Sequence, residues 1–257
     1  MNDTATRTRT DPRISRRRKA VARTKKRRVI VRALVAVGAA LSVWIAFFSP
    51  LMAVDELKLS GAKRTTAAEV ARVVSLDSSE NLLLLNTDEV ADAVKSLPWV
   101  KSVTVDRKLP GTVKLTITER SPVMAVAVGE QRYLIDRRAH VLEATESADG
   151  LPLLAGLTTS LPRPGDRLSS PQLTSALEAF GAMPRKLRRD VQAVFAPTVE
   201  RITFQLSDGV QVRYGAAEDM VSKNEVLKVL LSRLRLEARG PVYIDVRVPE
   251  APAVSEL

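Results

Sequence analysis

The longest feature of the hydrophobic pattern is an uncharged, almost wholly apolar run of 22 residues from Ala33 to Val54. As a helix it would extend roughly 33 Å, enough to cross the ~30 Å hydrocarbon core of a bilayer. A helix buried in a globular protein is rarely apolar on all sides over this length. The pattern therefore predicts a transmembrane helix over residues 33–52.

A cleaved signal peptide is the alternative, because a basic segment also precedes the apolar run of a signal peptide. Here the basic segment is about 30 residues long and the apolar run exceeds the usual ~7–15 residues. In addition, Trp44, Phe47 and Phe48 fit the aromatic belt of a membrane interface. An uncleaved anchor is favoured.

After this run, the pattern changes to short strands and helices. Residues 54–59 read as a strand, and residues 66–69 have the spacing of a capping box before a short apolar face. A second helix starts at residues 86–89 and stops at Pro98. Alternation from residue 103 to 117, with a Pro-Gly turn, then predicts a hairpin. The order is β-α-α-β-β, a small α+β domain.

Residues 202–248 show the pattern of a hairpin, a long helix and a final strand. Residues 202–206 and 210–214 alternate about Asp208-Gly209, which predicts a hairpin with a two-residue type I′ turn. A long amphipathic helix is predicted at about residues 217–238. Residues 243–248 alternate again as a terminal strand.

Several short motifs resemble one family. Leu97-Pro98-Trp99-Val100, followed by Glu119-Arg120-Ser121-Pro122, resembles the POTRA domain of the FtsQ/DivIB family of bacterial division proteins. Tyr133-Leu134-Ile135-Asp136 and the terminal strand resemble the β-domain of that family. Ala139-His140 departs from it, because the family usually places Gly in this turn, so the geometry of the turn stays open.

The resemblance implies an α+β ectodomain behind a single transmembrane helix, with a POTRA domain followed by a mixed β-domain that contains one long helix. The expected parts are a cytoplasmic, basic, disordered tail (1–32), the transmembrane helix (33–52), the POTRA domain (53–120), the β-domain (121–250) and a short C-terminal tail (251–257).

The charge of the chain is concentrated before the apolar run. Residues 1–32 hold 13 of the 40 basic and two of the 29 acidic residues, which leaves 27 of each sign in the rest of the chain. The positive-inside rule places this tail in the cytoplasm, where its charges favour an anionic membrane surface. A DNA-binding arm is the alternative for the tail. The neutral globular part predicts no nucleic-acid partner.

Composition argues against an enzyme. The chain has no Cys and one His, which excludes cysteine nucleophiles and Cys-ligated metals. It also lacks the Gly-x-Ser-x-Gly, phosphate-loop and dinucleotide motifs. His140, at a turn, is read as a solvated residue. We expect no catalytic residues, cofactor or metal.

The resemblance implies a non-enzymatic scaffold in the cell membrane at the division septum, with its N-terminus in the cytoplasm. Its partners would be bitopic proteins resembling FtsB and FtsL, and through them synthases of the FtsW and FtsI type. The alternative is a POTRA adaptor for protein transport or outer-membrane assembly, for which tandem POTRA units or a β-barrel would be expected.

Two strands are candidate interaction sites, because an unpaired sheet edge can accept a partner's strand. The first is the terminal strand, with Ile244, Val246 and Val248 facing the core and Tyr243, Asp245 and Arg247 facing a partner. The second is an outer strand of the POTRA sheet, either the hairpin strand, with candidate residues Val100, Ser102, Thr104 and Asp106, or the first strand of the domain.

Overall fold

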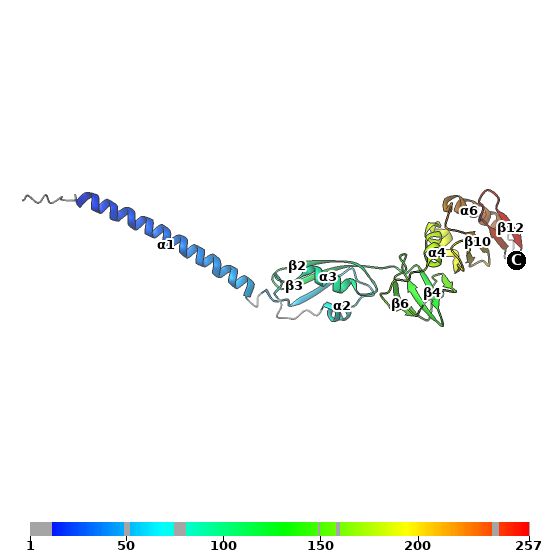
Figure 1. Cartoon of the computed structure of the whole chain (residues 1–257), viewed down its shortest axis with the longest axis horizontal. Helices are drawn as coiled ribbons and strands as arrows, with labels where there is room; N and C mark the ends of the chain where they lie inside the picture. The colour runs from blue at the N-terminus through cyan, green and yellow to red at the C-terminus, as the bar shows by residue number, and fades with distance from the viewer. Residues whose placement is uncertain are drawn as a thin grey trace, which may run out of the picture. The chain divides into compact units, whose positions relative to one another are not determined.

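The structure is a computed structural model that describes residues 12–48, 52–74, 81–148, 150–157, 160–237 and 242–256. Within these ranges the chain forms a long N-terminal helix, a three-stranded sheet with two short helices, and a nine-stranded sheet with three helices (Figure 1). The α+β class predicted from the sequence is confirmed.

Helix α1 spans Pro12–Phe48, and its stretch Arg27–Ile45 is long and apolar enough to cross a membrane, with all side chains exposed. The prediction of a disordered tail is wrong for residues 12–32, which are helical. The cause is that Arg, Lys and Ala are good helix formers and extend a helix already nucleated by the apolar segment. Residues 1–11 and 49–51, part of the predicted tail and transmembrane segment, lie outside the described residues.

The first sheet has the strand order β1-β3-β2, and its elements follow the predicted order β-α-α-β-β. The capping box that starts α2 is reciprocal: the backbone N–H of Thr66 donates to the Glu69 carboxylate at 2.8 Å, and that of Glu69 to the Thr66 hydroxyl at 3.2 Å. The elements are β1 (Glu56–Ser60), α2 (Ala67–Val74), α3 (Thr87–Lys95), β2 (Val100–Lys108) and β3 (Thr112–Glu119).

The second sheet has the order β12-β11-β10-β9-β8-β7-β4-β5-β6. Its strands are β4 (Met124–Val128), β5 (Gln131–Ile135), β6 (Val141–Thr145), β7 (Leu153–Ala155), β8 (Val191–Phe195), β9 (Ile202–Leu206), β10 (Gln211–Gly215), β11 (Val242–Asp245) and β12 (Ala253–Glu256). Its helices are α4 (Pro171–Ala182), α5 (Arg185–Asp190) and α6 (Met220–Leu236).

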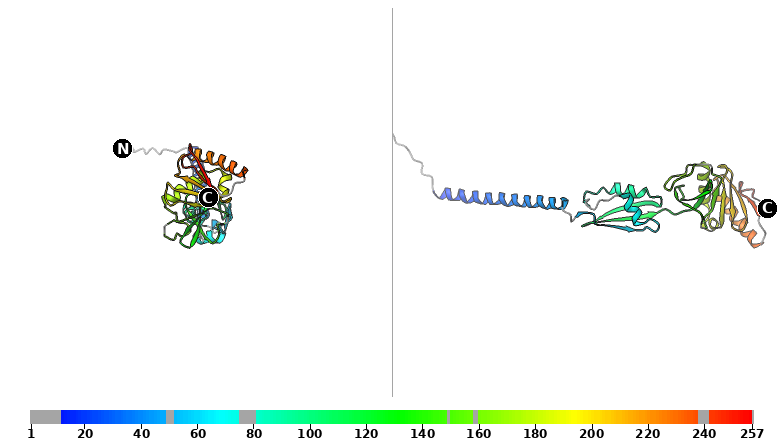
Figure 2. Two further views of the ribbon diagram at one scale, coloured as in Figure 1. Left: turned by 90° about the vertical axis from the view of Figure 1, so that its right-hand side faces the viewer. Right: turned by 90° about the horizontal axis from the view of Figure 1, so that it is seen from below.

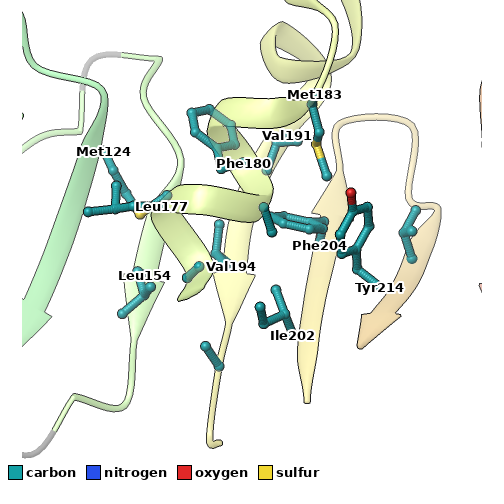
Figure 3. Packing of buried hydrophobic residues seen from close by; sticks show 14 of the residues in the cluster. Met124, Leu154, Leu177, Phe180, Met183, Val191, Val194, Ile202, Phe204 and Tyr214 are labelled. Atoms are coloured by element: carbon teal, nitrogen blue, oxygen red, sulfur yellow. The ribbon is translucent and has the colours of Figure 1, made fainter. Parts of the chain in front are cut away.

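The core lies between the second sheet and its helices. Figure 3 shows Leu177 of α4 beside Met124, and Phe204 beside Tyr214. The rings of Phe204 and Tyr214 meet edge to face with their centroids 5.4 Å apart. Helix α6 adds a row of leucines at the predicted helical spacing: Leu227, Leu231 and Leu234. Burial of these side chains fixes one face of the sheet and leaves the other face of β8 to β12 open.

The hairpin between β9 and β10 differs from the prediction at its turn. A type I′ turn needs positive φ at both central residues, but only Gly209 has it, at 85°. The N–H of Leu206 donates to Val210 O at 2.8 Å, and that of Gly209 donates to Leu206 O at 3.1 Å. The loop is therefore three residues long, with glycine at its left-handed position.

A buried carboxylate organises the turn between β5 and β6. Asp136 Oδ1 accepts the backbone N–H groups of Arg138 and His140, at 2.8 and 3.0 Å, and Oδ2 accepts the Arg120 guanidinium at 2.8 Å. Burial alone would raise the pKa of Asp136, but the His140 N–H, the Arg120 guanidinium and the Arg138 N–H outweigh it and lower that pKa. Ala139 occupies the place that favours Gly and takes a φ of 60°.

Substitution of Arg120 by Met should lower the free energy of unfolding by about 2 to 4 kcal/mol at neutral pH, because a largely buried carboxylate loses its counter-charge. The folded-state pKa of Asp136 is depressed, so its ionised form stabilises the fold above the unfolded pKa of about 3.9. The difference between the two proteins should shrink as the pH falls through the folded pKa. Urea unfolding of both proteins at neutral and acidic pH measures this difference in the free energy of unfolding.

The matched control is Arg138→Met, which changes an exposed side chain of the same turn and keeps the backbone N–H that Asp136 accepts. It should alter stability by less than about 0.5 kcal/mol. Equal effects of the two substitutions would show that the ion pair of Arg120 is not what stabilises the turn.

Candidate protein-interaction surfaces

Strand β11 contains the first half of the predicted interaction site, but it is not an edge strand. It pairs in parallel with β10 and antiparallel with β12. The strand ends at Asp245, and although Ile244 and Val246 are buried as expected, Val248 is 56% exposed. The prediction of a free terminal edge at residues 243–248 is therefore wrong, because residues 253–256 pair beyond it.

Strand β12 occupies that outer edge and corrects the expected C-terminal tail. It is the first strand in the order of the sheet, and within the described residues its one neighbour is β11 (Figures 1 and 2). Ala253, Val254 and Ser255 are exposed. Its outward backbone groups are thus available to a further strand.

The pairing register places two rows of side chains on the open face of the sheet, away from the helices. Tyr243 lies between Gln211 and Ser255 in one row, and Asp245 lies between Arg213 and Ala253 in the other. Phe195 belongs to the second row through Thr203 and is 47% exposed. This face therefore combines aromatic and charged side chains next to the free edge.

A shallow groove of about 360 Å³ lies on this open face. Three arginines line it, Arg201, Arg213 and Arg247, against one acid, Glu200. The groove therefore carries excess positive charge and would attract an acidic side chain.

The Tyr243 side chain lines this groove. The Arg213 guanidinium carbon lies 4.1 Å from the centroid of the Tyr243 ring, a cation–π arrangement. The Tyr243 hydroxyl oxygen is buried and has no hydrogen-bond partner among the described residues. An unpaired buried hydroxyl costs free energy in the folded protein.

Arg247 is held against the sheet by Asp245. Its Nη2 lies 2.7 Å from Asp245 Oδ2, and this hydrogen bond is the main cause that lowers the pKa of Asp245. Gly215 makes room for the arginine: a Cβ there would lie 2.9 Å from Arg247 Cγ, and φ is 76°. Two of the three expected partner-facing side chains are thus brought together, with Arg247 exposed and Asp245 half-buried.

The second predicted site lies on strand β2, an outer strand of the first sheet. Ser102 and Thr104 are exposed and Asp106 is half-buried, whereas the Val100 side chain is buried. Only the first three side chains can meet a partner. The recruiting role of this edge stays a prediction.

His140 is part of the Asp136 turn and is not a solvated residue as expected. Its Nδ1 lies 3.2 Å from Arg120 Nη1 and 3.4 Å from Asp136 Oδ1, and its side chain is 24% exposed. Among the described residues, no Ser or Thr hydroxyl is hydrogen-bonded to it, and no cluster of three potential metal ligands occurs.

Sequence reasoning missed Phe195, Arg201 and strand β12. Arg213 could have been found, because it alternates with the inward-facing Val212 and Tyr214. Strand β12 has four residues, too few for alternation to identify it.

Comparison with known families matches both parts of the chain. Residues 52–120 match the sequence model of the FtsQ-type POTRA domain, and residues 125–247 match that of the C-terminal domain of cell division protein FtsQ/DivIB.

Individual cell division proteins named FtsQ are similar to the chain over most of its length. The cell division protein FtsQ of Mycobacteroides abscessus is 32% identical over 226 residues, which cover 88% of this chain and 68% of that protein. The FtsQ of Corynebacterium glutamicum is 28% identical over 221 residues, covering 85% and 97%. A solved structure, the major extracytoplasmic domain of the trans isomer of DivIB from Geobacillus stearothermophilus, is 16% identical with a TM-score of 0.34, and covers 48% of this chain and 99% of that one.

Substitution of Arg247 by Ala should raise the pKa of Asp245 toward about 3.9, since the main group that lowers it is removed. The melting temperature should change by less than about 2 °C, because an exposed ion pair contributes little to stability. Carboxyl NMR titration and a thermal melt provide the two measurements. A large fall in melting temperature would mean that Arg247 serves the fold and is not free to bind a partner.

Proposed function

The chain belongs to the FtsQ/DivIB family of bacterial cell division proteins, and from this premise we propose that it is a single-pass membrane scaffold that joins other division proteins outside the cytoplasm. Its proposed partners are bitopic proteins resembling FtsB and FtsL, and through them septal synthases of the FtsW and FtsI type. The match of residues 125–247 to the FtsQ/DivIB C-terminal domain favours this reading over a POTRA adaptor for protein transport.

The free edge of β12 is the observation that carries this proposal. A strand hydrogen-bonded on one side offers main-chain donors and acceptors to a partner segment, which would extend the sheet by one strand. The expected site at Tyr243 to Val248 contributes instead to β11, the strand with which β12 pairs. Its Tyr243 and Arg247 line the adjacent groove, where an acidic residue of the same partner would bind.

The edge of β2 is a second proposed recruitment surface. It is an outer strand, and its exposed Ser102 and Thr104 leave room for an added strand. The proposed role is binding rather than catalysis, since Arg120 and Asp136 surround His140 as structural partners.

The proposed orientation places the N-terminus in the cytoplasm and both sheets outside, at the division septum. It is supported by the 13 basic residues among residues 1–32, which precede the uncharged run that begins at Ala33. The same residues are proposed to hold an anionic membrane surface.

Reporter fusions after residue 60 should be active only outside the cytoplasm, because the positive flank of α1 is retained inside. Amino-terminal sequencing of the membrane-bound protein should begin near Met1. A mature product that begins near Ala53 would contradict an uncleaved anchor.

Proline scanning tests the β12 edge. Neighbouring residues of a strand direct their N–H groups to opposite sides, so either Val254 or Ser255 has an N–H facing away from β11. The variants are Val254→Pro and Ser255→Pro. In one of them the melting temperature should stay the same while the amount of FtsB-like partner that copurifies falls at least about tenfold. The cause is the loss of one hydrogen bond between β12 and the added strand.

The matched control is Ala144→Pro, at an exposed position of β6, the opposite outer strand of the same sheet. The partner should still copurify with the Ala144→Pro variant. In the same assay, Thr104→Pro tests whether the partner binds at the β2 edge. Loss of the partner with Thr104→Pro, together with normal binding by both β12 variants, would assign partner binding to the first sheet.

A further inference from the structure

A second groove lies on the helix-covered side of the second sheet and belongs to none of the surfaces described above. Its volume is about 500 Å³. Val123, Leu151 and Phe180 contribute apolar surface, and α5 contributes Arg185, Arg188 and Arg189. We call it the arginine groove.

The three arginines have no acidic partner in the part of the chain that the structure describes. Arg185 and Arg189 are exposed and Arg188 is half-buried, and no ion pair joins any of them to a carboxylate. The acid of the same helix, Asp190, is bound by Arg235 at 2.8 Å instead. Their charge is thus uncompensated beside an apolar wall.

Stability of α5 does not explain all three arginines. Cations stabilise the last turn of a helix, which accounts for Arg188 and Arg189, but Arg185 is the first residue of α5, where the helix dipole opposes positive charge. Lys186 lines a different groove, between α5 and α6. One short helix therefore directs three guanidiniums to the arginine groove and one ammonium elsewhere.

We propose that the arginine groove binds a protein segment that combines acidic and apolar side chains. Guanidiniums bind carboxylates in bidentate geometry, and Val123 and Leu151 are half-buried, so an apolar side chain seated between them and α5 would be removed from water. A purely ionic polymer would leave this wall unused. The site shares no residue with the groove beside β12.

The test uses the full chain in nanodiscs of neutral lipid and fluorescence anisotropy of three labelled probes. The first probe is a short peptide in which glutamates alternate with leucine and phenylalanine, the second has glutamines in place of the glutamates, and the third is polyglutamate. The first should bind, and each of the others should bind at least about tenfold more weakly.

The double variant R185E/R189E should weaken binding of the first peptide at least about tenfold. The matched control K186E, the same charge change on the same helix, should leave it unchanged, with equal melting temperatures for all three proteins. Equal binding by R185E/R189E and the unchanged chain would overturn the proposal. Equal affinity for polyglutamate would also overturn it, in favour of a general anion surface. Because β12 is intact in every variant, failure here leaves the proposed function untouched.

Discussion

Backbone hydrogen bonding at the end of the nine-stranded sheet is the constraint on which the proposed role depends. Every interior strand pairs with a neighbour on both sides, whereas β12 and β6 have one neighbour each within the described residues. An outer strand must be covered, charged or paired. On β12 the exposed residues are Ala253, Val254 and Ser255, which are small or apolar, and a basic aromatic groove adjoins them. This edge is consequently suited to pairing.

The position of β12 depends on α6. Strands β10 and β11 are parallel, so the chain must cross over between them, and α6 supplies the crossover. Asn224 ties this helix to α4, since its Nδ2 donates to Ala182 O at 3.1 Å, while the Tyr214 hydroxyl donates to its Oδ1 at 3.4 Å. Burial raises the pKa of Tyr214 to about 12, so the hydroxyl stays protonated as a donor. The packing of α6 against the core therefore determines where β11 and β12 lie in the sheet.

Local patterns predicted much of this fold, and non-local pairing accounts for most of what they missed. Alternation identified the hairpins β2–β3 and β9–β10, and helical spacing identified the amphipathic helix that is α6. Strand β7 has three residues and pairs in parallel with β4 and β8, contacts that no local sequence signal specifies. Strand β12 was missed for a different reason: it pairs with the preceding strand β11, but its four residues are too few for alternation to identify it. Its absence from the prediction made β11 look like an edge. Ala139 shows that a left-handed turn can form without glycine when Asp136 holds the neighbouring N–H groups.

The most direct test of the central claim is amide hydrogen exchange of the full chain, measured alone and with the proposed FtsB-like partner bound. If the partner adds a strand to β12, exchange of residues 253–256 should slow markedly on binding, because outward N–H groups enter a ladder. Exchange in β6, the opposite edge, should stay the same. Slowed exchange confined to β2, with β12 unchanged, would contradict the account.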